Sequence, residues 1–340
     1  MQANPTRQAI SGPGVWTGRD YAGNDDWILH LTATHLAEID TAAGMVPDKF
    51  PALYDVTADD FPLPSLGPAL TALGDELEHG RGFVLIRGLP VERYSADRLA
   101  AIFWGLGAYF GVGLAQSTKG DRLGHVIDLS GPESDVGQMR NYELGGDLRM
   151  HTDLNNDMVG LLMLRAAKSG GESRIASSMA IHNIILDERP EFLEPLFHGY
   201  YFHHLRKERA EGANRTAHRV PVFSDYDGAL SCHFNPSPVE RAVTRAGVTL
   251  SALEAGAFRF FAEVATRSDV CFDMALRPGD IQLLNNHIVL HGRTDYEDYP
   301  ESERRRHLLR LWLRCAGARK QAPETQVYKT DALGFRNVTN

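Results

Sequence analysis

Two histidines and one aspartate are the residues of this chain whose types and spacing best fit a metal site. His151 and Asp153 are separated by one residue, and His291 follows in the segment Asn286–Arg293. Two imidazoles and one carboxylate on one face of a metal ion leave its other coordination positions open, a donor set typical of non-haem Fe(II) oxygenases. Because residues i and i+2 of a strand share a face, His151 and Asp153 are expected to bind one ion while Thr152 faces away.

The composition is that of an ordinary globular protein, with 340 residues, 43% hydrophobic and 23% charged. The net charge of −9 carries no long basic run, so nucleic acid is not an expected partner. Three widely spaced cysteines, Cys232, Cys271 and Cys315, indicate reduced thiols rather than a disulfide framework or a zinc knuckle.

No targeting or membrane segment is predicted. Residues 1–7 lack a basic segment followed by an apolar one, and no stretch approaches the ~18 apolar residues of a membrane span. We therefore expect a soluble cytoplasmic protein that binds a small molecule. The sequence leaves the oligomeric state open, with a homo-oligomer among the options.

Short apolar runs bounded by Gly, Pro and Asn predict the strands that must position the ligands. Helices are predicted where apolar periodicity follows a capping residue, such as Ser95 or the Ser251–Glu254 capping box. The strands are expected at 82–90, 160–167, 173–177, 199–206, 219–224, 229–234, 271–275, 281–284 and 307–314. The helices are expected at 65–78, 95–110, 178–187 with Ser178 as cap, and 251–266.

Many short strands with a few helices predict a mostly β fold with flanking helices, built on a double-stranded β-helix, or jelly roll. Since the ligand histidines come from distant parts of the chain, we expect a single domain over residues 1–340. Residues 1–60 would form an N-terminal arm and approach, about 80–315 the core, and 319–340 a tail. The first 25 residues are expected to lie over the surface, and 116–149 to form an irregular rim of the site.

Around the ligands the chain resembles the taurine dioxygenase-like, or clavaminate synthase-like, family of Fe(II)/2-oxoglutarate dioxygenases. The resemblance covers roughly residues 80–315 and implies Fe(II), with 2-oxoglutarate and O2 as cosubstrates. It favours His291 over His287 as the distal ligand, because Leu290–Arg293 matches the family's pattern. The matching segments are His151-Thr152-Asp153, Gly170-Gly171-Glu172-Ser173, Asn286-His287 through His291-Gly292-Arg293, and Arg306-His307-Leu308-Leu309-Arg310.

The far carboxylate of 2-oxoglutarate needs a fixed cation, and the planar fork of arginine gives it two parallel charge-assisted bonds. The resemblance assigns this role to Arg306, together with the hydroxyl of Ser173, where the family often has threonine. Arg306, Leu308, Arg310 and Trp312 would share one strand face. Because a second inward arginine is costly without an anion, and some relatives bind an acidic substrate group at the matching position, Arg310 favours a carboxylate-bearing substrate.

Further residues are candidates for the substrate pocket or for supporting the metal ligands. Asn141 and Tyr142 precede the first ligand, and Leu154 and Asn155 follow it, so these four are expected to line the substrate pocket. Asn286 is expected to orient a ligand through a hydrogen bond. Two further hypotheses are that His287 has a packing or supporting role and that Arg293 pairs with a carboxylate or with Asp280.

The resemblance implies oxidation of an unactivated C–H bond of a small, carboxylate-bearing molecule, such as an amino acid or a secondary-metabolite intermediate. The intact Asp153 favours hydroxylation, because related halogenases have a small residue at that position. Desaturation or cyclisation on the same scaffold remains an alternative. A barrel protein that binds metal or ligand without turnover is a second alternative, and a zinc hydrolase that uses the same three residues is a third.

Overall fold

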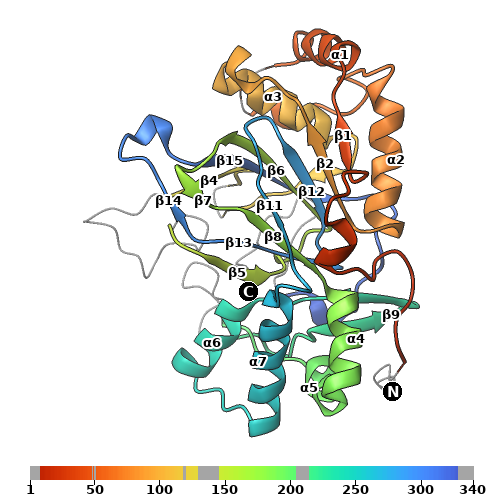
Figure 1. Ribbon diagram of the computed structural model, residues 1–340, viewed down its shortest axis with the longest axis vertical. Helices are drawn as coiled ribbons and strands as arrows, with labels where there is room; N and C mark the ends of the chain where they lie inside the picture. The colour runs from red at the N-terminus through yellow and green to blue at the C-terminus, as the bar shows by residue number, and fades with distance from the viewer. Residues whose placement is uncertain are drawn as a thin grey trace.

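The computed structural model describes residues 8–47, 49, 51–117, 120–128, 145–203 and 214–327. Two β-sheets form its centre, with helices gathered at the two ends of the view in Figure 1. The larger sheet has the order β1-β2-β12-β6-β15-β3, and β4 also pairs with β15. Its strands are β1 (Ile28–His30), β2 (Phe83–Arg87), β12 (Ile281–Asn285), β6 (Met158–Arg165), β15 (His307–Arg314), β3 (Val112–Gly113) and β4 (Leu123–Ile127).

The smaller sheet has the order β11-β8-β13-β5 and supplies the metal-site histidines. Its strands are β11 (Phe272–Met274), β8 (Ser173–Ser177), β13 (Val289–Arg293) and β5 (Leu148–His151). Two ribbons complete the β structure, β9 (Phe223–Tyr226) with β10 (Ala229–Cys232), and β7 (Ser169–Gly170) with β14 (Tyr296–Glu297). The chain therefore combines mixed sheets with several helices.

The helices form two groups, one beside each sheet (Figure 1). Helices α1 (Ala33–Ala43), α2 (Leu66–His79) and α3 (Ala96–Gly107) lie beside the larger sheet, and α4 (Ser178–Glu188), α5 (Leu193–His198), α6 (Pro236–Arg245) and α7 (Ala252–Thr266) lie beside the smaller one. Each group buries an apolar face against its sheet, as the packing of Leu309 and Leu311 with α3 and of Leu290 with α7 illustrates. Among the described residues, no helix has the length and apolar character needed to cross a membrane.

Strand β15 separates the outer core from the space between the sheets. Leu309, Leu311 and Leu313 pack into the outer cluster with the helices, as expected from the two-residue period of a strand. Leu308 packs on the other face with Ile175 of the smaller sheet. The predicted common face of Arg306, Leu308, Arg310 and Trp312 is thus directed between the sheets, and all four side chains are buried.

Most predicted elements are present with shifted ends. Helices α2, α3, α4 and α7 lie where they were expected, although Ser177 rather than Ser178 caps α4. Strand β4 lies inside the segment that was predicted to be irregular. The predicted strand at 199–206 is reduced, over its described residues, to isolated bridges of Tyr200 and His203. Helices α1, α5 and α6 were not predicted from the sequence.

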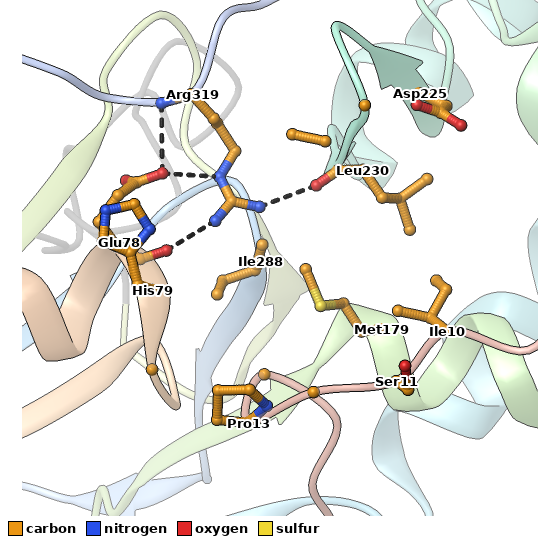
Figure 2. A pocket seen from close by; sticks show the side chains of 15 residues that line it. Ile10, Ser11, Pro13, Glu78, His79, Met179, Asp225, Leu230, Ile288 and Arg319 are labelled. Carbon is orange, nitrogen blue, oxygen red and sulfur yellow. Dashed lines mark hydrogen bonds and ion pairs between the residues drawn. The ribbon is translucent and has the colours of Figure 1, made fainter.

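The N-terminal arm does more than cover the surface. Trp16 is only 3% exposed, donates its indole N–H to the carbonyl of Arg81 at 2.7 Å, and meets Phe83 edge to face. The expectation of a surface arm is therefore wrong for this residue. Residues 10–14 line a cavity of about 370 Å³ beside the end of α2, where Arg319 of the tail pairs with Glu78 at 3.1 Å (Figure 2).

Candidate active site

The structure brings the three predicted metal ligands together. His151 and His291 are directly opposite each other in the antiparallel pair β5–β13, and their ring centroids are 4.4 Å apart. Asp153 Oδ1 lies 3.6 Å from His151 Nε2, and Asp153 Oδ2 lies 3.8 Å from His291 Nε2. One donor atom from each residue lies within 4.8 Å of the others, which is close enough for all three to bind a single ion.

Asp153 reaches the histidines from just beyond the end of β5. Thr152 points the other way and exchanges hydrogen bonds with Phe234, whose carbonyl accepts from the Thr152 N–H at 2.7 Å. The expected alternation of His151, Thr152 and Asp153 therefore holds, although only His151 belongs to the strand.

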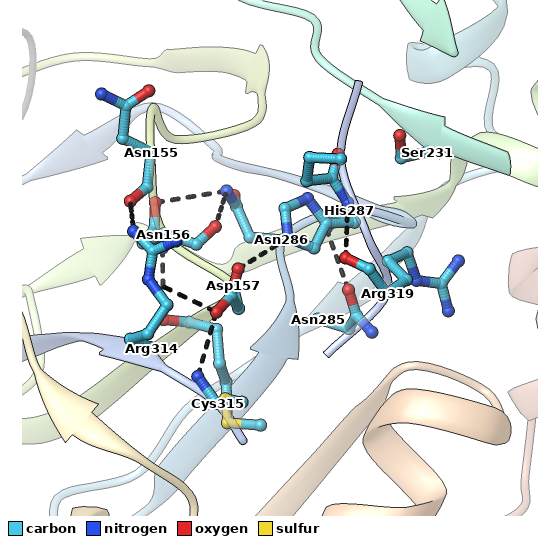
Figure 3. Close-up of polar contacts among 12 residues, drawn as sticks. Asn155, Asn156, Asp157, Ser231, Asn285, Asn286, His287, Arg314, Cys315 and Arg319 are labelled. Carbon is cyan, nitrogen blue, oxygen red and sulfur yellow. Dashed lines mark hydrogen bonds and ion pairs between the residues drawn. The ribbon is translucent and has the colours of Figure 1, made fainter. Parts of the chain in front are cut away.

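Asn286 fixes the main chain of Asp153. Its Oδ1 accepts from the Asp153 N–H at 2.8 Å, and its Nδ2 donates to the carbonyls of Asp153 and Asn156 at 2.9 and 3.0 Å. His287 points to Asp157, with Nε2 to Oδ1 at 3.1 Å, in a polar cluster that also contains Asn286 (Figure 3). The metal-ligand cluster accordingly contains His291 and not His287, as the sequence predicted.

Hydrogen bonds and burial prepare the imidazoles for a metal. His151 Nδ1 lies 2.9 Å from the Arg149 carbonyl, which makes this nitrogen the protonated one and leaves the Nε2 lone pair for the ion. Burial, with a further contribution from His151, lowers the pKa of His291 to about 3, so its ring is neutral at physiological pH. Neutral imidazoles are the form that binds metals.

The Asp153 carboxylate is surrounded by donors and positive charge. Burial raises its pKa, but Arg310 and the two histidines outweigh this and hold the pKa below its usual range. Trp312 donates its indole N–H to Oδ2 at 2.6 Å, and Arg310 Nη1 lies 3.9 Å from the same oxygen. Gln116 accepts from Arg310 Nε at 2.7 Å and so fixes the guanidinium. Asp153 therefore remains an anion, as a ferrous ligand must.

Arg306 is a buried cation beside the Gly170-Gly171 turn. It is 5% exposed, and its Nη2 donates to the Gly171 carbonyl at 3.3 Å. Within the described part of the chain its Nε has no hydrogen-bond partner and its guanidinium forms no ion pair. Burial and the charge of Arg293 lower its pKa to about 10. An anionic ligand at this position would stabilise the buried cation.

Comparison with known proteins assigns the chain to a family. The sequence profile described as "Taurine catabolism dioxygenase TauD, TfdA family" matches residues 48–312, which is more than half of the chain. The chain belongs to this family. It is therefore an Fe(II)- and 2-oxoglutarate-dependent oxygenase, and the resemblance that was inferred from the motifs is confirmed.

Two curated TauD/TfdA relatives cover most of the chain. "FR-33289 synthase" of Streptomyces rubellomurinus is 30% identical over 92% of this chain and 93% of its own length. "Taurine hydroxylase-like protein SAT17" of Stachybotrys chartarum is 29% identical over 87% of this chain and 77% of its own.

Solved structures of low sequence identity share the fold. Asparagine oxygenase in complex with Fe(II), 3-hydroxyasparagine and succinate superposes with a TM-score of 0.66 at 15% identity, over 85% of this chain and 93% of that one. The non-haem iron oxygenase OrfP, in complex with Fe and α-ketoglutaric acid, gives 0.60 at 15% identity, over 84% and 93%.

The TauD/TfdA cofactors fit the residues present. Two imidazoles and one carboxylate suit a ferrous ion, and a buried guanidinium without an ion-pair partner among the described residues suits a dicarboxylic acid. When bound, the ferrous ion with 2-oxoglutarate supplies the redox chemistry that activates dioxygen. The chain itself supplies orientation, charge and exclusion of water.

The remaining residues that were predicted to bind cosubstrate or substrate have different surroundings. Asn141 and Tyr142 are outside the described residues. Ser173 is buried and donates to Gln282 Oε1 at 2.9 Å. Leu154 packs partly buried against the core beside the smaller sheet, and the Asn155 carbonyl accepts from Arg314 at 3.0 Å.

Of the two alternatives for Arg293, pairing with Asp280 is wrong, and pairing with another carboxylate stays a prediction. Asp280 does not pair with Arg293, because it forms two bonds of 2.9 and 2.8 Å with Arg87 across β2 and β12. Arg293 instead donates to the Gly146 carbonyl and lies over the ring of Tyr296.

Sequence reasoning missed two residues that contact the site, Gln116 and Trp312. Gln116 lies in the segment that was predicted only as a rim, and nothing in its neighbours marks it. The two-residue period of the strand predicted that Trp312 faces inward. Its bond to Asp153 could not be predicted, because the two residues are 159 positions apart in the sequence.

Proposed function

We propose that this oxygenase hydroxylates an unactivated C–H bond of a small molecule that carries an acidic group, such as an amino acid or a secondary-metabolite intermediate. The observation that carries this proposal is Arg310, which is 5% exposed and lies on the same face as Arg306. Its Nη1 is 3.9 Å from Asp153 Oδ2, so the cation stands beside the metal site, where it would draw an anionic substrate to the ion.

The relatives support this substrate class by their own ligands. Asparagine oxygenase was solved with 3-hydroxyasparagine, and OrfP with 3-hydroxy-L-arginine, both hydroxylated amino acids. The intact Asp153 favours hydroxylation over halogenation, as the family resemblance implies.

We propose further roles for the predicted cosubstrate residues. Arg306 would bind the far carboxylate of 2-oxoglutarate through its guanidinium, with the Ser173 hydroxyl as a second donor after leaving Gln282. His151, Asp153 and His291 would hold the ion. Asn141, Tyr142, Leu154 and Asn155 remain proposed lining residues. The two facing sheets support a double-stranded β-helix within one domain.

A substrate panel tests the proposal. Purified protein with Fe(II), ascorbate and 2-oxoglutarate is incubated with amino acids and other carboxylic acids, and each acid is paired with its methyl ester as a neutral control. We expect succinate release and a product heavier by one oxygen for an acid but not for its ester. A product lighter by two hydrogens would favour the alternative of desaturation or cyclisation. Absence of succinate with every compound would count against a substrate of these classes.

The variant Arg310→Gln tests the anion contact. Removing one partner of a buried charge pair costs roughly 2–5 kcal/mol. We therefore expect the KM for the acidic substrate to rise by at least 30-fold, roughly the lower end of that range. Iron affinity is measured in parallel, because Arg310 also faces Asp153. An unchanged KM would show that the substrate's acidic group binds elsewhere.

A further inference from the structure

Trp312 contacts a metal ligand without being one. Its indole Nε1 donates to Asp153 Oδ2 at 2.6 Å, and the two side chains are 6% and 7% exposed. A short bond from a neutral donor to a buried carboxylate is charge-assisted and strong.

The two oxygens of Asp153 have different environments. Oδ2 receives the indole N–H and lies 3.9 Å from Arg310 Nη1, so its electron density is already shared with two positive or partly positive groups. Each oxygen also faces a ligand histidine, Oδ1 at 3.6 Å from His151 Nε2 and Oδ2 at 3.8 Å from His291 Nε2. Because the indole N–H bonds to Oδ2, Oδ1 keeps more of its lone-pair density for a metal ion.

We propose that Trp312 is a positioning residue that holds Oδ2 and so presents Oδ1 alone to the ferrous ion. A carboxylate that bound through both oxygens would occupy a coordination position that the keto acid or dioxygen needs. Asn286 holds the Asp153 main chain but leaves the carboxylate able to rotate, so the indole supplies the restraint that Asn286 cannot.

The indole is itself held without any metal. Trp312 is paired with Val159 of β6 in the sheet and packs beside Leu114, and the Arg310 guanidinium lies 4.6 Å from its ring centre. The Arg310 guanidinium and the Trp312 indole N–H therefore both face Asp153 Oδ2, and both belong to β15. A site supported in this way is pre-organised before the ion arrives.

The variant Trp312→Phe removes the donor and keeps an aromatic ring. Mutation of a residue that supports a metal ligand typically lowers metal affinity about 10–100-fold, and we expect this loss for Fe(II) added anaerobically to the metal-free protein and followed by calorimetry. We also expect the absorption band of the iron–2-oxoglutarate complex to shift. Unchanged affinity and an unchanged band would overturn the proposal.

Trp16→Phe is the matched control. Trp16 is equally buried and donates a comparable bond of 2.7 Å, but to the Arg81 carbonyl. This variant should lose stability without losing iron affinity. In an Asp153→Ala background, Trp312→Phe should have no further effect on metal binding. A loss of the same size in that background would show that the indole acts by another route.

A measurement on the unmutated protein covers the case in which Trp312→Phe does not fold. Zn(II), a diamagnetic substitute, is titrated into the ¹⁵N-labelled metal-free protein, and the indole N–H signals are followed by NMR. The proposal expects the Trp312 indole proton to stay protected from exchange with solvent before and after zinc binds. Loss of protection on zinc binding would mean that Oδ2 leaves the indole for the metal, contrary to the proposal.

Discussion

At the scale of single residues, the site contains a buried cation that has no ion-pair partner among the described residues. Arg306 is buried, its pKa is lowered to about 10, and no described carboxylate forms an ion pair with it. A lone buried cation reduces stability and is retained where a ligand needs it. The proposed cosubstrate role of Arg306 would therefore oppose its effect on stability.

The variant Arg306→Gln should separate the effect of Arg306 on 2-oxoglutarate binding from its effect on stability. We expect the affinity for 2-oxoglutarate to fall by roughly 2–5 kcal/mol, as for removal of one partner of a buried charged pair. The free energy of unfolding of the ligand-free protein should stay the same or rise, since the buried charge is gone. Calorimetric titration and urea denaturation measure the two quantities. Arg304→Gln, at an exposed guanidinium, is the control and should change neither. Loss of stability without loss of affinity would make Arg306 a structural residue.

At the scale of elements, the turn before β8 determines how closely Arg306 can approach the chain. Gly171 has φ +76°, and a Cβ there would lie 3.1 Å from Arg306 Nε. Gly171→Ala should therefore strain the backbone and displace the guanidinium. Gly228→Ala is the matched control, with φ +78° and no atom within 4 Å of the added carbon. Both variants should lose about 1–2 kcal/mol of stability, but only Gly171→Ala should weaken 2-oxoglutarate binding, measured by titration. Equal affinities of the two variants for 2-oxoglutarate would show that the contact of Gly171 with Arg306 does not affect cosubstrate binding.

The elements also show how far sequence reasoning reaches. The alternating face of β15 could be predicted because a two-residue period places Leu309 and Arg310 on opposite sides. Helix α6 could not, because its prolines read as breaks although the first turn of a helix accepts them. Isolated pairs such as Tyr200 with Val220 depend on tertiary contacts that no local pattern encodes. The ligand triad was predictable from its motifs, whereas the bond from Trp312 was not.

At the scale of the whole molecule, the metal-binding side chains come from distant parts of the sequence and meet because two sheets are packed between two helical groups. The outer cores keep β15 and β13 in place, and the space between the sheets holds an apolar cluster around Leu308 and Ile175 together with the buried polar side chains of the site. Buried titratable side chains make stability depend on protonation.

His233 provides the clearest case for this dependence. It is buried, its Nε2 lies 2.9 Å from Gln321 Oε1, and burial lowers its pKa to about 3, with a further contribution from His287. In the unfolded chain a histidine takes up a proton near pH ~6.5. Because the folded pKa is depressed, the unfolded state binds the extra proton between these values, and acid favours unfolding. We expect His233 to lower the free energy of unfolding by about 1.4 kcal/mol for each pH unit below ~6.

The variant His233→Gln tests this slope in the metal-free protein, where proton release by metal binding does not contribute. Urea unfolding at pH 7, 6 and 5 should show a dependence on pH that is weaker by about one proton than in the unmutated chain. His218→Gln, at an exposed histidine, should leave the slope unchanged. Parallel curves for His233→Gln and the unmutated protein would mean that His233 takes up its proton at the same pH in the folded state as in the unfolded state. The polar cluster around His287 and Asp157 would then have to accommodate a buried charge, and acid sensitivity would have to come from elsewhere in the fold.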